Sequence, residues 1–216
     1  MSERRIALAA GLGLALVLTV VVAAAGIRLE TGVPGLRIVH RIAASLEVVV
    51  VLWLAWMAPR SRPVWIALGL TALLSIVGIA AGQNPPPAAA AVNLLGGLAL
   101  AAVFAWILGS GRAAGNRALT PILLLLAVQL ALGAWLTIVD RFGMALPAHG
   151  IIAVVLTALF VWFERARPIL LVLALAAPLA GFTALHADRS AVAALLHAAA
   201  AALLLAAAAY SIARAA

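Results

Sequence analysis

The chain has 216 residues, of which 68% are hydrophobic and 9% charged, and its mean hydropathy is +1.26. Soluble domains are about 45–50% apolar and about 25% charged, so this composition excludes a soluble globular protein and indicates an integral membrane protein. The net charge of +8 comes from fourteen arginines and no lysine against six acids, and the chain contains no cysteine, which excludes disulfides, thiolate metal sites, iron–sulfur clusters and covalently attached c-type haem.

Eight apolar runs follow one another along the chain, separated by short breaks that contain Arg, Pro or Gly. A helix that crosses the hydrocarbon needs ~20 residues. Because alternation with a period of two is absent, each run predicts a transmembrane helix rather than a strand. The fold class is therefore an all-α membrane protein with eight transmembrane helices, expected at residues 6–27, 38–58, 64–82, 88–109, 119–139, 149–163, 168–186 and 190–212.

The first run has two features of a secretory signal, because Arg4 and Arg5 precede it and it ends in three alanines. Its apolar length of about 20 residues exceeds that of a normal signal core and fits a membrane span. We therefore expect it to be retained as the first helix.

The arginines also predict the orientation, since cytoplasmic loops of membrane proteins carry an excess of positive charge. With the N-terminus in the cytoplasm, nine arginines fall on the inner side and five on the outer side. We therefore expect both termini in the cytoplasm and a multi-pass protein of the bacterial inner membrane. The inner set is Arg4, Arg5, Arg60, Arg62, Arg112, Arg117, Arg165, Arg167 and Arg214, and the outer set is Arg28, Arg37, Arg41, Arg141 and Arg189.

An internal repeat divides the chain into residues 1–112 and 113–216. Pro63 begins the third predicted helix and precedes Asn93 of the fourth by thirty positions, while Pro168 begins the seventh and precedes His197 of the eighth by twenty-nine. Such repeats commonly frame a binding site in membrane folds. The spacing predicts two pseudo-symmetric four-helix bundles.

Four polar residues mark equivalent places in this repeat, each near the start of an even-numbered helix: His40, Asn93, His149 and His197. With the N-terminus inside, the even-numbered helices begin at the outer face. The four side chains should therefore form one layer beneath the outer surface, two in each half. Polar groups inside a membrane usually face the bundle interior.

His149 and His197 form a candidate metal-binding pair in the second half. Imidazoles from facing helices can occupy both axial positions of a haem iron, and a chain without thiolates favours b-type haem. Arg141 and Arg189 precede the two helices on the outer side, where they would hold anionic propionates. The alternative is two interface histidines bonded to backbone carbonyls. Zinc is disfavoured, because no third ligand lies at the same depth.

The first half pairs His40 with Asn93, whose amide is a poor haem ligand, so we expect one haem in the chain. Glu47 follows His40 by seven residues, almost two turns, and can point the same way into the bundle. One interpretation is a quinol pocket in which His40 accepts the first proton and Glu47 relays the second, with Arg37 and Arg41 beside the layer. The alternative is that Glu47 pairs with a buried polar group or an arginine and only fixes packing.

These residues make the sequence similar to the haem A synthase family, membrane proteins with eight helices in two pseudo-symmetric halves. The likeness covers nearly the whole chain. It is carried by His40-Arg41, by Val128-Gln129-Leu130-Ala131-Leu132-Gly133-Ala134, by Pro147-Ala148-His149-Gly150 and by Leu196-His197-Ala198.

The resemblance implies a b-type haem between His149 and His197. It also implies a haem substrate in the first half, between two further histidines with a glutamate one turn before the first. Only His40 matches that second set, because the other ligand position holds Asn93 and the glutamate position holds Arg37. Both departures lie in the substrate half.

The sequence therefore favours a haem b-binding electron-transfer protein, similar to a quinol dehydrogenase. Since the chain has no redox domain of its own, this function requires a periplasmic acceptor, a copper or c-haem protein. Two alternatives stay open: a haem A synthase, which oxidises the haem O methyl group, and a haem-binding oxidase assembly factor. Arg37 and Asn93 argue against the synthase, and Glu47 is used by the quinol hypothesis but not by the assembly-factor hypothesis.

Overall fold

The computed structural model describes residues 3–28, 34–82, 84–110, 119–138, 145–164, 167–186 and 191–213. In these ranges the chain forms eight α-helices and no strand, which confirms the all-helical prediction. The helices are α1 (Glu3–Arg28), α2 (Leu36–Met57), α3 (Arg62–Ala81), α4 (Pro87–Gly109), α5 (Leu119–Ile138), α6 (Ala145–Glu164), α7 (Pro168–His186) and α8 (Ala191–Ala213).

The helix ends lie within three residues of the predicted ones, except at the start of α6. That helix begins at Ala145, four residues earlier than expected, so His149 is its fifth residue. Pro147 does not prevent this start, because the amide groups of a first helical turn have no partner within the helix and a proline there loses no bond.

The outside of the molecule is apolar, as a lipid-facing surface requires. By length and composition, α1, α2, α3, α4, α6 and α8 can cross a membrane, while α5 and α7 contain the shorter apolar stretches Thr120–Leu136 and Pro168–Ala184. Ile79 exposes 83% of its surface, and Trp56 and Trp162 each expose 76%. In a soluble protein these side chains would be buried, so their exposure supports a multi-pass membrane protein.

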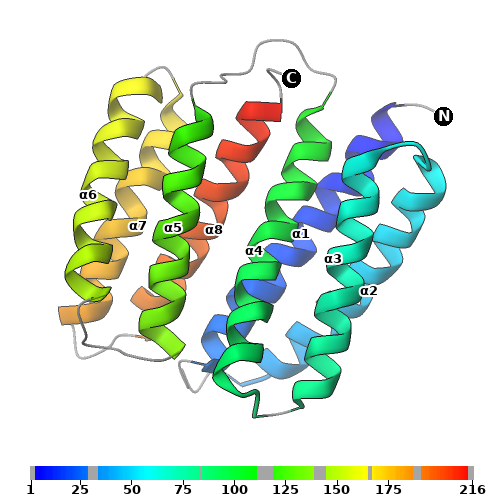
Figure 1. Cartoon of the computed structure of the whole chain (residues 1–216), viewed down its shortest axis with the longest axis horizontal. Helices are drawn as coiled ribbons and strands as arrows, with labels where there is room; N and C mark the ends of the chain where they lie inside the picture. Colours follow the sequence, from blue (N-terminus) through cyan, green and yellow to red (C-terminus); the bar gives the residue numbers. More distant parts are fainter. Residues whose placement is uncertain are drawn as a thin grey trace.

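The helices stand side by side as one bundle, and the start of α1 lies at the same end as the end of α8 (Figure 1). Contacts join α1 to α2, α2 to α3, α3 to α4 and α4 back to α1. A second set joins α5 to α6, α6 to α7, α7 to α8 and α8 back to α5. Helix α8 also packs on α1 and α4, and α4 touches α5.

The core is densest where α1, α4 and α8 meet. Phe104 of α4 is fully buried, and its ring lies against Gly13 of α1, where a Cβ atom would overlap it. Where α4 meets α8, Ala105 of α4 packs with Ala206 and Ala209 of α8. Small residues let helix backbones approach closely in a membrane, where dispersion rather than the exclusion of water holds helices together.

Two of the short breaks contain a glycine in a left-handed conformation. Gly35 precedes α2 with φ 79°, and Gly82 follows α3 with φ 67°. A side chain at a positive φ is strained, so glycine is the residue that turns the chain there at the lowest cost.

Helix α7 contains an internal proline, and a neighbouring helix compensates for it. Pro178 has no N–H to donate to the carbonyl oxygen of Ala174 one turn earlier. The hydroxyl of Thr157 on α6 lies 3.1 Å from that oxygen and 2.8 Å from the carbonyl oxygen of Ala153 in its own helix. The Ala174 carbonyl therefore still has a donor nearby, as a polar backbone group in lipid requires.

Candidate functional site

The second half brings His149 and His197 together. Their ring centroids are 6.1 Å apart and the ring planes meet at 74°. His149 lies in the second turn of α6 and His197 in the second turn of α8, and both side chains are partly buried. The two histidines, which occupy equivalent positions in the repeat, thus lie close to each other.

A glycine on the preceding helix makes room for each ring. A Cβ atom on Gly133 of α5 would lie 3.1 Å from Cε1 of His149, and one on Gly181 of α7 would lie 2.9 Å from Nδ1 of His197. Each glycine stands sixteen positions before its histidine. The space beside each imidazole is therefore open because the facing residue is glycine, and an alanine would begin to fill it. We call these two spaces, beside Gly133 and Gly181, the glycine cradles.

A hydrogen bond to α7 shows that Nδ1 of His197 carries a proton. Its Nδ1 lies 2.7 Å from the carbonyl oxygen of Ala177, twenty positions earlier. A carbonyl can only accept a hydrogen bond, so Nδ1 carries the proton and donates it. In the neutral ring, Nε2 then keeps a lone pair for a metal ion, which is the arrangement found for histidines that bind metals.

His149 also contacts the residue twenty positions earlier in the sequence, on α5, but through its backbone oxygen rather than its ring. Gln129, also twenty positions earlier, donates from Nε2 to the backbone oxygen of His149 at 2.9 Å. Nδ1 of His149 is buried and has no hydrogen-bond partner among the described residues. Without a partner at Nδ1, the tautomer of this ring is not fixed there, in contrast to that of His197.

The pair fits a haem better than a zinc ion. Two imidazole nitrogens, each about 2 Å from one shared metal ion, place their ring centroids about 6 Å apart. Structural and catalytic zinc sites need three or four protein ligands, and no group of three His, Cys, Asp or Glu side chains occurs in the part of the chain that is described. Haem iron needs only two axial ligands.

In the first half, His40 and Glu47 bond to different helices. Nδ1 of His40 lies 3.2 Å from the carbonyl oxygen of Val20 on α1, again twenty positions earlier. Glu47 is 6% exposed, and Thr71 of α3 donates to its Oε1 at 2.7 Å. These contacts do not join the two groups directly, although both lie on the inward side of α2. The pairing of Glu47 with a buried polar group is the bonding that the packing alternative predicted.

The other residues of the first-half site lie near the end of that half at which α2 and α4 begin. Asn93 is partly buried in α4, and Arg37 and Arg41 are exposed on α2. Arg28 at the end of α1 reaches the carbonyl oxygen of Ala90 at 3.4 Å. At the two positions that match Gly133 and Gly181, sixteen before His40 and Asn93, the first half has Ala24 and Val77.

Two expected site residues lie outside the described residues. Arg141 and Arg189, the candidate propionate ligands, belong to the segments before α6 and α8. Their role stays a prediction from the sequence.

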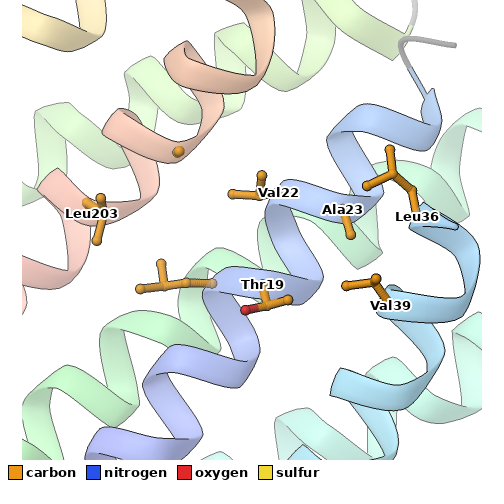
Figure 2. A pocket seen from close by; sticks show the side chains of 8 residues that line it. Thr19, Val22, Ala23, Leu36, Val39 and Leu203 are labelled. Atoms are coloured by element: carbon orange, nitrogen blue, oxygen red, sulfur yellow. The ribbon is translucent and has the colours of Figure 1, made fainter. Parts of the chain in front are cut away.

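A shallow apolar groove of about 340 Å³ runs across α1 between α2 and α8. Figure 2 shows Thr19, Val22 and Ala23 on α1, with Leu36 and Val39 of α2 on one side and Leu203 of α8 on the other. The groove lies beside the first turn of α2, just before His40 in the second turn. It is lined by residues of both halves.

Sequence reasoning did not identify the residues that support the histidines. Gln129 and Gly133 lie in one of the motifs that carry the family resemblance, but that motif does not indicate their contacts with His149. The signal was present as a Gly–His spacing of sixteen, which occurs at both histidines of the second half. Thr71 had no comparable signal, because its partnership with Glu47 depends on how α2 and α3 are rotated.

Neither a scan against protein-family models nor a search of curated proteins finds a match to this chain.

Proposed function

We propose that this protein is a b-type haem protein of the bacterial inner membrane that transfers electrons, with His149 and His197 as the axial ligands. The observation that carries the proposal is the 6.1 Å separation of the two rings. The glycine cradles and the Nδ1–H tautomer of His197 support it, because they leave room for both rings and leave Nε2 of His197 with a lone pair for a metal ion.

When bound between His149 and His197, the haem would supply a one-electron redox centre. The chain's own contribution is to hold the two rings in place and to exclude water. Helices α5 and α7 perform the first task through Gly133, Gly181 and the Ala177 carbonyl. The apolar surroundings perform the second.

The proposal includes the two-half organisation. The contacts of α1 with α2 and α4, and of α3 with the same two helices, support a four-helix unit within residues 1–112. The corresponding contacts among α5, α6, α7 and α8 support another within residues 113–216. The even number of helices and the arginine distribution support cytoplasmic positions for both termini. Arg141 and Arg189 would then reach the haem propionates from the outer side.

We propose quinol as the electron donor, with His40 and Glu47 as its proton acceptors. Glu47 is a buried carboxyl group near the middle of α2, and ionisable groups at such depth commonly serve proton transfer. Since Nδ1 of His40 donates to Val20, its Nε2 is the atom that would take a proton. The groove beside the first turn of α2 gives an apolar molecule access from the lipid. The electrons would pass to a periplasmic copper or c-haem protein.

One observation favours haem A synthase as a second candidate. His40 bonds to a carbonyl oxygen twenty positions earlier, as His197 does, so the first half keeps one histidine in a setting suited to haem. Co-expression with a source of haem O distinguishes the candidates. We expect no haem A to form, because Asn93 provides no second imidazole.

The deciding experiment is the pyridine haemochrome spectrum of the purified protein, which identifies the haem and counts it. We expect one b-type haem per chain. Replacing His149 or His197 by alanine should remove it, whereas His40→Ala should keep the haem and slow its reduction by a short-chain quinol. Colourless protein after growth with ample iron would refute the proposal, and so would a spectrum that survives both replacements.

A further inference from the structure

In the second half, each histidine is hydrogen-bonded by the residue twenty positions before it, but the atoms that form the bond differ between the two. At twenty positions before His197, the acceptor for its ring is a backbone carbonyl, Ala177 O. At the same position before His149 stands Gln129, whose side chain rather than backbone reaches toward the histidine. A glutamine side chain ends in a carbonyl of its own, so it can take the place of the backbone group.

The amide of Gln129 is oriented by its contact with His149. Because the backbone oxygen of His149 can only accept, the group facing it at 2.9 Å must be the NH₂ of the amide. Oε1 therefore occupies the other branch of the amide. Gln129 is 8% exposed, so water has little access to that oxygen.

Two buried side-chain atoms lack a hydrogen-bond partner among the described residues, and they complement each other. They are Oε1 of Gln129 and Nδ1 of His149. The first is an acceptor, and the second is a donor when it carries the ring proton. Buried polar atoms are nearly always paired, so two unpaired ones on directly contacting residues point to a bond that forms when the ring is in its working position.

We propose that Gln129 is the positioning residue of His149, with Nε2 donating to its backbone oxygen and Oε1 accepting from its ring Nδ1–H. This inference rests on the proposed haem site. These two hydrogen bonds fix the Nδ1–H tautomer of His149, which leaves the lone pair of Nε2 free to bind a metal ion. Gln129 thus gives His149 the support that Ala177 gives His197. Outer hydrogen bonds of this kind orient a ligating histidine and raise its basicity.

The test compares Gln129→Leu and Gln129→Glu with Thr183→Val. The control removes an exposed hydroxyl of α7 that bonds only within its own helix, to the carbonyl oxygen of Leu179. We expect Gln129→Leu to keep a b-type spectrum but to lose haem to a scavenger about 10- to 100-fold faster. Its midpoint potential should rise, since a less basic ligand stabilises the oxidised iron less. Gln129→Glu should lower the potential, and Thr183→Val should match the wild type.

The tautomer is measured separately by ¹⁵N NMR of histidine-labelled protein before haem is added. We expect the Nδ1–H form for His149 in the wild type and a mixture of forms in Gln129→Leu. An Nε2–H form in the wild type would overturn the inference, as would an unchanged potential and rate of haem loss in Gln129→Leu. If the wild type binds no haem, the proposed function fails while the NMR result still decides the role of Gln129.

Discussion

In the second half the ring centroids of His149 and His197 lie 6.1 Å apart in an edge-on arrangement, whereas in the first half the place of His197 is taken by Asn93. The difference extends to the supporting helices. Glycines stand sixteen positions before both histidines of the second half, and Ala24 and Val77 stand at those positions in the first. The absence of a second imidazole and the absence of the two glycines thus occur in the same half.

The strongest test of this comparison replaces His197 by asparagine, the residue that the first half has at the equivalent position. His197→Asn should abolish the low-spin b-type spectrum, because an amide does not replace an imidazole on haem iron. Haem content per chain, measured as the pyridine haemochrome, should fall at least about tenfold, the lower bound for losing even an outer-shell partner of a metal ligand. Equal haem content in the variant and the wild type would show that the halves do not differ in this way.

The clearance provided by glycine can be tested without changing a ligand. Gly181→Val places a side chain where even a Cβ atom would lie 2.9 Å from Nδ1 of His197, so the ring is displaced and haem content should fall severalfold. Gly150→Ala is the matched control, since a Cβ atom there meets nothing within 4 Å. The cradle has no function if both variants carry the same amount of haem per chain.

The first half should affect the rate of reduction rather than the haem. Glu47→Gln keeps an acceptor for the Thr71 hydroxyl but removes the proton acceptor, so reduction by quinol in a stopped-flow measurement should slow by about 100-fold. The absorption spectrum should stay unchanged. Thr71→Val is the comparison variant, because it removes the hydrogen bond and keeps the carboxyl group. An unaltered rate in Glu47→Gln would favour the packing role of Glu47.

The smallest expected effect concerns packing alone. Gly13→Ala forces a Cβ atom against the fully buried ring of Phe104 and should lower the free energy of unfolding by about 1–3 kcal/mol. Gly11→Ala on the same helix meets nothing within 4 Å and should leave stability unchanged or raise it by about 1 kcal/mol through helix propensity. Unfolding in detergent measures both. Haem content should not differ between them.

The sequence predicted the helices well because span length and polar breaks determine them almost alone. The start of α6 was predicted four residues too late, because a proline such as Pro147 usually interrupts a helix. A proline is nevertheless compatible with the first turn of a helix. The approach of His149 to His197 followed from the repeat. The partners of Gln129 and Glu47 could not be predicted, because they depend on helix rotation, which an apolar sequence with almost uniform hydrophobicity does not specify.

Pro178 has a consequence for how the protein is made. Outside this fold, α7 would enter the bilayer with the Ala174 carbonyl lacking the donor that the proline removed. Thr157 lies on α6, which is synthesised first, so the hydroxyl that can satisfy that carbonyl is already available when α7 emerges. The two segments are therefore suited to leave the translocon as one hairpin rather than one after the other.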